Sequence, residues 1–327
     1  KQALQMQKLS IMNTVYADRE GHLFYVNNGR IPKRRNPKLD YGGVLRADTM
    51  AWYWEGVHPL ADLVQVQDPE CGWVMNTNNT PSRSTCRTEN PLKNSYPSYM
   101  DLRPGDNNRA NRLRAQMEAE PKVDWQRFQA MKFDDLIARR GAFYESMGPL
   151  YALDVDDYPG IRDILSSIQS WDGSADTTSI PAAQTMVAME WVFSQNNFSD
   201  YEFVMGMEGV TDSTFVRAVR HAKDYLLQHF GTIQVPLGRI QRYHVHGRSY
   251  AVPGYADALM ANYSHPWEPA EKGQEADGSY DVFAGDTYLQ FSRFTKEQGL
   301  THLRSLVPFT PYSGKKKQPY RDQMRVY

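Results

Sequence analysis

Residues 11–26 have the sequence IMNTVYADREGHLFYV, which predicts a β-hairpin. Residues 11–17 and 22–26 are rich in β-branched and aromatic side chains, and such runs favour strands. Between them lies Asp18-Arg19-Glu20-Gly21, a combination of residue types that is typical of a turn. We therefore expect two antiparallel strands joined by a tight connection.

The segment after this hairpin carries few helix signals. Pro32 and Pro37 keep the chain extended beyond the second strand. From Tyr41 to about Pro104, aromatic residues stand among Gly, Pro, Asp and Asn. Long ordered loops of this kind are uncommon in a compact domain unless they build a site. We therefore expect residues 1–104 to be a β-rich part of the core whose loops carry function.

Helical periodicity begins after Arg109 and predicts a mainly helical region over residues 105–235. Its clearest helix spans 211–230, where apolar residues recur at helical spacing behind a Thr/Asp cap and before Gly231. Further helices are predicted at 123–140, 163–169 and 181–193. Strand patterns return within residues 236–327, for example at 280–283. This order predicts a mixed α/β or α+β protein with three successive regions.

Composition excludes several classes of protein. The chain has 327 residues, of which 41% are hydrophobic, so it holds enough apolar side chains for a core. Its net charge of −1 provides no electrostatic footprint for nucleic acid. No apolar run approaches the roughly 18 residues of a membrane span, so we expect no membrane-spanning segment in this sequence. The sequence begins at Lys1 with neither an initiator Met nor a signal peptide, and we expect the chain to be a processed fragment or one piece of a longer chain.

Two polar groupings have plain interpretations. His244 and His246 lie two residues apart, so on a strand they would face the same side, as metal ligands sometimes do. Because no third ligand lies nearby in the sequence, a surface or hydrogen-bonded pair is the better interpretation. Asp134-Asp135 has no catalytic motif around it, and we interpret these carboxylates as solvated.

Residues 72–81, GWVMNTNNTP, hold three asparagines within four positions. Composition alone indicates a tightly bonded turn. The alternative is that one carboxamide points into a pocket, where a neutral N–H donor stabilises the charge that develops on a carbonyl oxygen. Cys71 and Cys86 bracket this loop. The sequence is compatible both with a disulfide, which would indicate an oxidising compartment, and with two reduced thiols.

Several segments together resemble the penicillin amidase family of N-terminal-nucleophile hydrolases. Their order and rough spacing match that family, and the resemblance spans nearly the whole chain. It is strongest from about residue 10 to residue 90. The matching segments are Tyr16-Ala17-Asp18, Gly29-Arg30, Trp54-Glu55-Gly56, Gly72-Trp73 and Asn76-Thr77-Asn78-Asn79-Thr80-Pro81.

The resemblance implies a four-layer αββα sandwich, of which this chain would be a part, namely the C-terminal majority of the β subunit, carrying a large helical insertion. It also implies an exported bacterial precursor that cuts itself into an α and a β subunit, located in the periplasm or secreted. The nucleophile would be a Ser at the new β terminus, with its own α-amine as the base. Lys1 is not that serine, so the resemblance implies partners, namely the N-terminal β segment and the α subunit.

The family's functional residues carry over at a few positions. Asn78 falls on the oxyanion-hole asparagine, which polarises the scissile carbonyl. Arg109 or Arg112 lies near a supporting arginine, with Arg109 the first choice. Glu89 and Pro37 match two calcium ligands found in some members. Calcium takes about 6–8 oxygen ligands, and these two residues supply only a carboxylate and a carbonyl, so whether a structural calcium ion binds is an open question. The chemistry itself requires no cofactor.

The expected function is therefore an amide hydrolase that removes an acyl group from a small N-acyl amine. Acyl-homoserine lactones or other long-chain acyl amides are favoured as substrates, because the asparagine turn and the hairpin look closer to that branch of the family. A β-lactam acylase is the alternative within the class. A non-catalytic periplasmic binding or assembly subunit of the same fold is the alternative outside it, since the nucleophile is absent from this sequence.

Overall fold

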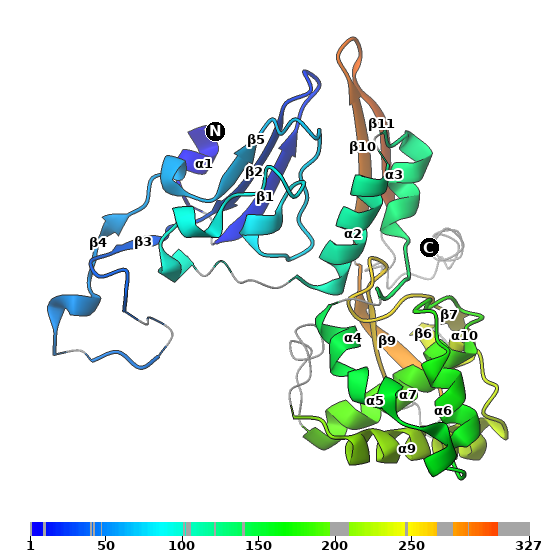
Figure 1. Ribbon diagram of the computed structural model, residues 1–327. Coiled ribbons are helices and arrows are strands. Elements are labelled where there is room, and N and C mark those ends of the chain that lie inside the picture. Colours follow the sequence, from blue (N-terminus) through cyan, green and yellow to red (C-terminus); the bar gives the residue numbers. More distant parts are fainter. Residues whose placement is uncertain are drawn as a thin grey trace. The chain divides into compact units, whose positions relative to one another are not determined.

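The computed structural model of the chain describes residues 2–8, 11–39, 41, 43–46, 48–100, 102, 106–120, 122–138, 141–196, 209–245, 248–266, 277–286 and 288–306. The chain divides into two compact units (Figure 1). The first unit consists of residues 1–106 and 293–301. The second consists of residues 107–292 and 302–327.

The first unit is built on a three-stranded antiparallel sheet. Strand β2 (Leu23–Asn28) lies between β1 (Met12–Ala17) and β5 (Gln65–Gln67). Its residues Phe24 to Val26 are buried, whereas β1 lies at an edge and is mostly exposed. The shorter elements of this unit are α1 (Gln2–Gln5), β3 (Pro32–Arg34), β4 (Trp54–Val57) and the 3₁₀ turns η1 (Met50–Trp52), η2 (Leu60–Asp62), η3 (Pro81–Arg83), η4 (Lys93–Ser95) and η5 (Ser98–Met100).

The predicted hairpin is confirmed as β1 and β2, and its turn explains why it forms. The Asp18 carboxylate accepts hydrogen bonds from the backbone N–H groups of Glu20 at 2.9 Å and His22 at 3.0 Å. Gly21 adopts φ 90°, a conformation that suits a residue without a side chain. An aspartate and a glycine at these positions therefore close the connection locally.

The second unit has a helical core. Helix α7 (Ile180–Asn196) is buried along most of its length and packs against α9 (Asp212–Phe230). Helix α6 (Arg162–Gln169) adds Ile164, Leu165 and Ile168 to the same core. The other helices are α2 (Asn108–Ala119), α3 (Trp125–Lys132), α4 (Ala142–Ser146), α5 (Gly148–Ala152), η6 (Val155–Asp157) and α10 (Leu237–Ile240).

A mixed four-stranded sheet completes this unit, with the strand order β7-β6-β9-β8. Strand β6 pairs in parallel with β9, and the other neighbours pair antiparallel. Strands β10 and β11 form a separate two-stranded pair, of which residues 293–301 belong to the first unit. The strands are β6 (Gln241–Val245), β7 (Arg248–Ala251), β8 (Asn262–Pro266), β9 (Tyr280–Gly285), β10 (Leu289–Thr295) and β11 (Gly299–Leu306).

The predicted helices at 163–169, 181–193 and 211–230 are confirmed as α6, α7 and α9. The helix predicted over 123–140 is wrong beyond Lys132, where α3 ends. Asp134 accepts a hydrogen bond from its near neighbour Leu136, which then forms a β-bridge with Ser174. These local and long-range bonds replace the helical ones. Arg139 and Arg140 lie outside the described residues.

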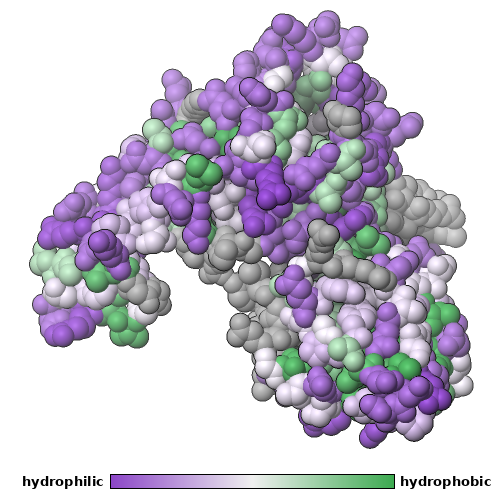
Figure 2. All heavy atoms as spheres, viewed as in Figure 1, coloured by the Kyte–Doolittle hydropathy of each residue, from purple (hydrophilic) through white to green (hydrophobic). Residues whose placement is uncertain are grey.

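The structure is a mixed α+β protein, as the sequence predicts. Within the described ranges, none of the helices combines the length and the apolar character that crossing a membrane requires. Figure 2 shows a face that is mostly hydrophilic, on which apolar residues form small groups. Met12, Val15 and Tyr16 of β1 are among the large apolar side chains that remain exposed.

Candidate active site

Asn78 stands at the outer position of the asparagine turn. Its φ of 64° is left-handed, a conformation that asparagine tolerates better than most residues. The Asn78 backbone N–H donates to Oδ1 of Asn76 at 3.2 Å, which shapes the turn. The side chain of Asn78 is exposed, and its carboxamide makes no hydrogen bond within the described part of the chain. Its N–H groups are therefore available to a ligand.

The base of this turn is anchored in the body of the first unit. A disulfide joins Cys71 to Cys86 across a sequence separation of 15 residues. Between these cysteines, the Met75 backbone N–H donates to the carbonyl of Ser84 at 2.8 Å. The Thr85 hydroxyl donates to the carbonyl of Trp73 at 2.8 Å. The turn is therefore the tip of a closed loop rather than a free segment.

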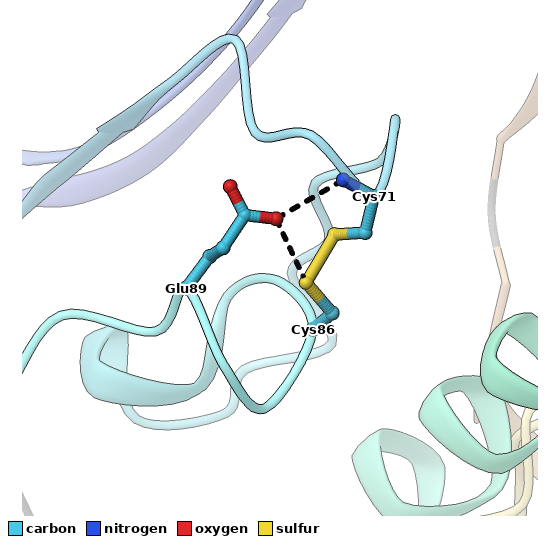
Figure 3. Close-up of side chains that lie close together, drawn as sticks. All are labelled: Cys71, Cys86 and Glu89. Carbon is cyan, nitrogen blue, oxygen red and sulfur yellow. Dashed lines mark hydrogen bonds between the residues drawn. A yellow bond between two sulfur atoms is a disulfide. The ribbon is translucent and has the colours of Figure 1, made fainter.

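Glu89 closes the loop from outside. Its carboxylate accepts hydrogen bonds from the backbone N–H groups of Glu70 at 2.8 Å and Cys71 at 3.0 Å. The same carboxylate lies 3.1 Å from Sγ of Cys86 (Figure 3), a disulfide sulfur that has no proton to donate. Candidate ligand atoms of Cys71, Cys86 and Glu89 lie within 4.8 Å of one another. Because metals bind the thiolate form of cysteine, the disulfide removes two of these three ligands.

The two predicted calcium ligands have other partners in the structure. Two N–H donors face the Glu89 carboxylate, whereas a cation requires lone pairs that point at it. The carbonyl of Pro37 accepts a hydrogen bond from the hydroxyl of Ser98 at 2.8 Å. Both groups therefore take part in hydrogen bonds within the first unit. Calcium binding stays a prediction.

Arg109 lies in the first turn of α2, in the second unit. Its Nε donates to Oδ1 of Asp257 at 2.9 Å, and the Asp257 side chain is only 1% exposed. The backbone N–H of Asn108 donates to the other carboxylate oxygen at 2.6 Å. Burial raises the pKa of the Asp257 carboxyl, and the neighbouring Arg109 partly offsets that rise. The visible role of Arg109 is to neutralise a buried acid at the start of a helix.

Arg112, the second candidate, also has an acidic partner. It makes a two-point contact with Asp134, with distances of 3.1 Å and 2.5 Å. Asn78 belongs to the first unit, whereas both arginines belong to the second. A supporting role for either arginine in catalysis stays a prediction.

His244 is hydrogen-bonded through both ring nitrogens. Nδ1 lies 3.1 Å from Asp281, and Nε2 lies 3.3 Å from the hydroxyl of Ser279, an order that resembles a catalytic Ser-His-Asp array. However, Ser279 is 2% exposed and donates its proton to Asp277 at 2.5 Å. His244 is therefore part of a structural network rather than of a nucleophilic site, and the predicted partner His246 lies outside the described residues.

Comparison with known families identifies the chain. The family model described as penicillin amidase matches residues 1–327, which is the whole sequence. The chain belongs to the penicillin amidase family. Among curated proteins of this family, penicillin G acylase of Escherichia coli is 35% identical over 80 residues, which is 24% of this chain and 9% of that protein.

A solved member of the penicillin amidase family has a similar fold. A thermostable penicillin G acylase from Alcaligenes faecalis matches with a TM-score of 0.54 and 16% sequence identity. The match covers 98% of this chain and 64% of the solved chain. At this identity the likeness shows the fold alone. The chain described here therefore spans less than two thirds of the length of either relative.

Two residues that bond to the predicted site residues or to their neighbours, one in each unit, carry weak sequence signals. Asn79, adjacent to Asn78, is 4% exposed and forms the buried part of the turn. Composition indicates a bonded turn but does not say which asparagine is buried. Asp257 follows Arg109 by 148 positions, and nothing local in the sequence connects the two. Its left-handed φ of 63° is a property of the folded backbone alone.

Proposed function

We propose that the chain is the part of an N-terminal-nucleophile acylase that supplies the oxyanion-hole side chain. The observation that carries this proposal is the Asn78 carboxamide, which is exposed, without a hydrogen-bond partner among the described residues, and held at the tip of a disulfide-closed loop. Membership of the penicillin amidase family supports the same reaction class.

In the proposed reaction, a Ser on polypeptide outside this chain attacks the carbonyl carbon of an N-acyl amine. The amine then leaves, and water hydrolyses the resulting acyl-enzyme ester. Asn78 donates an N–H to the carbonyl oxygen as negative charge develops there. A donor of this kind is effective because it is neutral and already oriented, and losing one costs roughly 100- to 1,000-fold in kcat. Asn78 would therefore act on the transition state rather than on substrate binding.

The proposed substrates are acyl-homoserine lactones or other long-chain acyl amides, a choice that rests on the sequence of the asparagine turn and the hairpin. Hydrolysis of a penicillin side-chain amide is a second candidate. It is favoured by the finding that both relatives described above are penicillin G acylases. The two candidates differ in the acyl chain and in the amine that leaves.

The proposal includes the assembly and the compartment. We propose that the chain packs with an N-terminal β segment and an α subunit of the same precursor to complete a four-layer αββα sandwich. An exported, periplasmic or secreted location is supported by the Cys71–Cys86 disulfide, because disulfides persist in oxidising compartments.

The test begins with the protein purified from its native source, analysed by intact-mass measurement and N-terminal sequencing. We expect co-purifying polypeptide that begins with Ser. The complete assembly is then assayed on a panel of long-chain acyl-homoserine lactones, penicillin G and a simple acyl anilide. Release of free amine from any of them supports the acylase, and the preferred substrate decides between the two candidates.

Recovery of the 327-residue chain with no Ser-terminated partner, combined with no hydrolysis of the panel, would contradict the proposed function. That result would instead favour a non-catalytic binding or assembly subunit of the same fold.

A further inference from the structure

Asn79 bonds to the backbone on both sides of Asn78. On the preceding side, its Oδ1 accepts hydrogen bonds from the backbone N–H of Thr77 at 2.8 Å and the Thr77 hydroxyl at 3.3 Å. On the following side, its Nδ2 donates to the carbonyls of Thr80 at 3.1 Å and Arg83 at 3.0 Å. One side chain, 4% exposed, therefore ties together residues 77, 80 and 83.

These bonds explain why Asn78 points outward. The backbone at Asn78 is left-handed, a conformation that residues other than glycine adopt only at some cost, so the turn must be held by its neighbours. Asn79 supplies that restraint from inside the loop. Its Oδ1 holds residue 77 before Asn78, and its Nδ2 holds residues 80 and 83 after Asn78. A loss of the Nδ2 bonds would therefore free only the segment that follows Asn78.

The groups to which Asn79 bonds are themselves held in place. Arg83 pairs with Asp106 at 3.1 Å, and the Asp106 side chain is 1% exposed. The adjacent residues Ser84 and Thr85 are both fully buried. The Cys71–Cys86 disulfide then links the two ends of the loop. A fixed frame of this kind lets a single buried carboxamide set the orientation of its exposed neighbour.

We propose that Asn79 is the positioning residue of the oxyanion hole: it fixes the left-handed conformation of Asn78, and with it the direction of the Asn78 carboxamide. This inference rests on the proposed function, since it gives Asn79 a role in the same reaction. A misplacement of about 1 Å in a catalytic group can cost on the order of 100-fold in rate. Asn79 therefore affects kcat without touching the substrate.

The test compares Asn79→Asp with Asn90→Asp in the complete assembly. Asn79→Asp keeps the acceptor for Thr77 but replaces the two N–H donors with an oxygen that faces two carbonyls. Asn90→Asp is the matched control. Asn90 Oδ1 accepts from the Thr85 backbone N–H at 3.0 Å, and its Nδ2 has no partner in the described part of the chain. Both variants are assayed well below their melting temperatures.

We expect Asn79→Asp to lower kcat about 10-fold or more with KM within about twofold, whereas Asn90→Asp leaves both near the parent values. Backbone amide exchange on the side of the turn that follows Asn78, at residues 79–84, should rise in Asn79→Asp only, a readout that needs no activity. Burial beside two carbonyl oxygens should raise the pKa of the new carboxyl, and its protonation restores one donor, so the loss of kcat relative to the parent should shrink as the pH is lowered.

Equal kcat values for the two aspartate variants would overturn the role of Asn79. Removing the Asn78 side chain separates this failure from a failure of the proposed function. If Asn78→Gly lowers kcat but Asn79→Asp does not, the oxyanion donor stands and the positioning role falls. If Asn78→Gly leaves kcat unchanged, the proposed function itself falls.

Discussion

Arg109→Ala should destabilise the second unit far more than the same substitution at Arg112. Removing Arg109 leaves the Asp257 carboxylate without its cation at a site where the side chain is 1% exposed. Breaking a buried ion pair by removing one partner costs about 3–5 kcal/mol. Arg109 itself is 21% exposed, and Asp257 keeps the Asn108 N–H, so we expect the lower end, about 3 kcal/mol.

Arg112 provides the matched control on the same helix. Its partner Asp134 is 16% exposed and keeps two other donors, the Gln116 side chain at 3.0 Å and the Leu136 backbone N–H at 3.2 Å. Arg112→Ala should therefore cost about 1 kcal/mol. The loss of stability in both variants is measured by urea unfolding, with amide exchange in residues 107–292 as the probe. This readout does not assume that the two units unfold together.

The pH dependence gives an independent check on Arg109. Burial raises the pKa of Asp257 above 3.8 in the folded state, so between the unfolded and the folded pKa the native protein binds more protons. The stability that protonated Asp257 contributes is present below pH 3.8 and is lost as the pH rises through the folded pKa. The cost of Arg109→Ala should therefore shrink as the pH is lowered toward 4. It should also fall to about 1 kcal/mol in the Asp257→Asn background, where no charge is left unpaired. Equal costs for Arg109→Ala and Arg112→Ala, or a cost unaffected by Asp257→Asn, would refute the reasoning.

Three further predictions concern the stability of the second unit, measured by thermal or urea unfolding. Burial lowers the pKa of His221, so the stability that the neutral imidazole contributes is lost as the pH falls below 6.5. His221→Gln should therefore make the free energy of unfolding depend less on pH below 6.5. An unchanged pH dependence in this variant would contradict that role of His221. Gly254 adopts φ 93°, and in Gly254→Ala the new Cβ would lie 2.1 Å from the carbonyl oxygen of Met260, so this variant should lose about 3 kcal/mol or more of stability. Gly231→Ala, where the new Cβ meets open space, should lose about 1 kcal/mol. Similar losses in the two variants would contradict this close contact at Gly254. Thr211→Ala should cost about 1 kcal/mol by removing the cap of α9, and no loss would show that the cap is dispensable.

Elements with their own local signals could be predicted from the sequence. The hairpin follows from Asp18 and Gly21, which close the turn without help from the rest of the chain. Helix α9 follows from its amphipathic pattern, its Thr211 cap and Gly231, which adopts φ 71° at the C-cap. In these cases local propensity and tertiary packing favour the same structure.

The remainder depends on contacts between distant residues. The helix predicted over 123–140 ends early because Asp134 is held by Arg112 and accepts from Met260 through its backbone carbonyl. No local pattern shows that the chain will be diverted there. The partner of Arg109 is equally remote in sequence. Long-range ion pairs of this kind require the fold to be known first.

The asparagine turn lies between these cases. Residue types identify a bonded turn, and the resemblance selects Asn78 within it, but the sequence leaves the state of Cys71 and Cys86 open. The structure joins these cysteines, buries Asn79 and exposes Asn78. Which of two adjacent, identical side chains faces outward is decided by one left-handed backbone angle, and composition does not encode that angle.

The kcat of Asn78→Gly in the complete assembly tests the central claim most directly. Glycine accepts the φ of 64° without strain, so this variant removes the carboxamide while the turn is kept. Asn94→Gly, at an exposed asparagine in η4, serves as the control. The account predicts that Asn78→Gly lowers kcat about 100-fold or more, with KM and the melting temperature close to those of the control. A kcat equal to that of the control would contradict the claim that Asn78 stabilises the transition state.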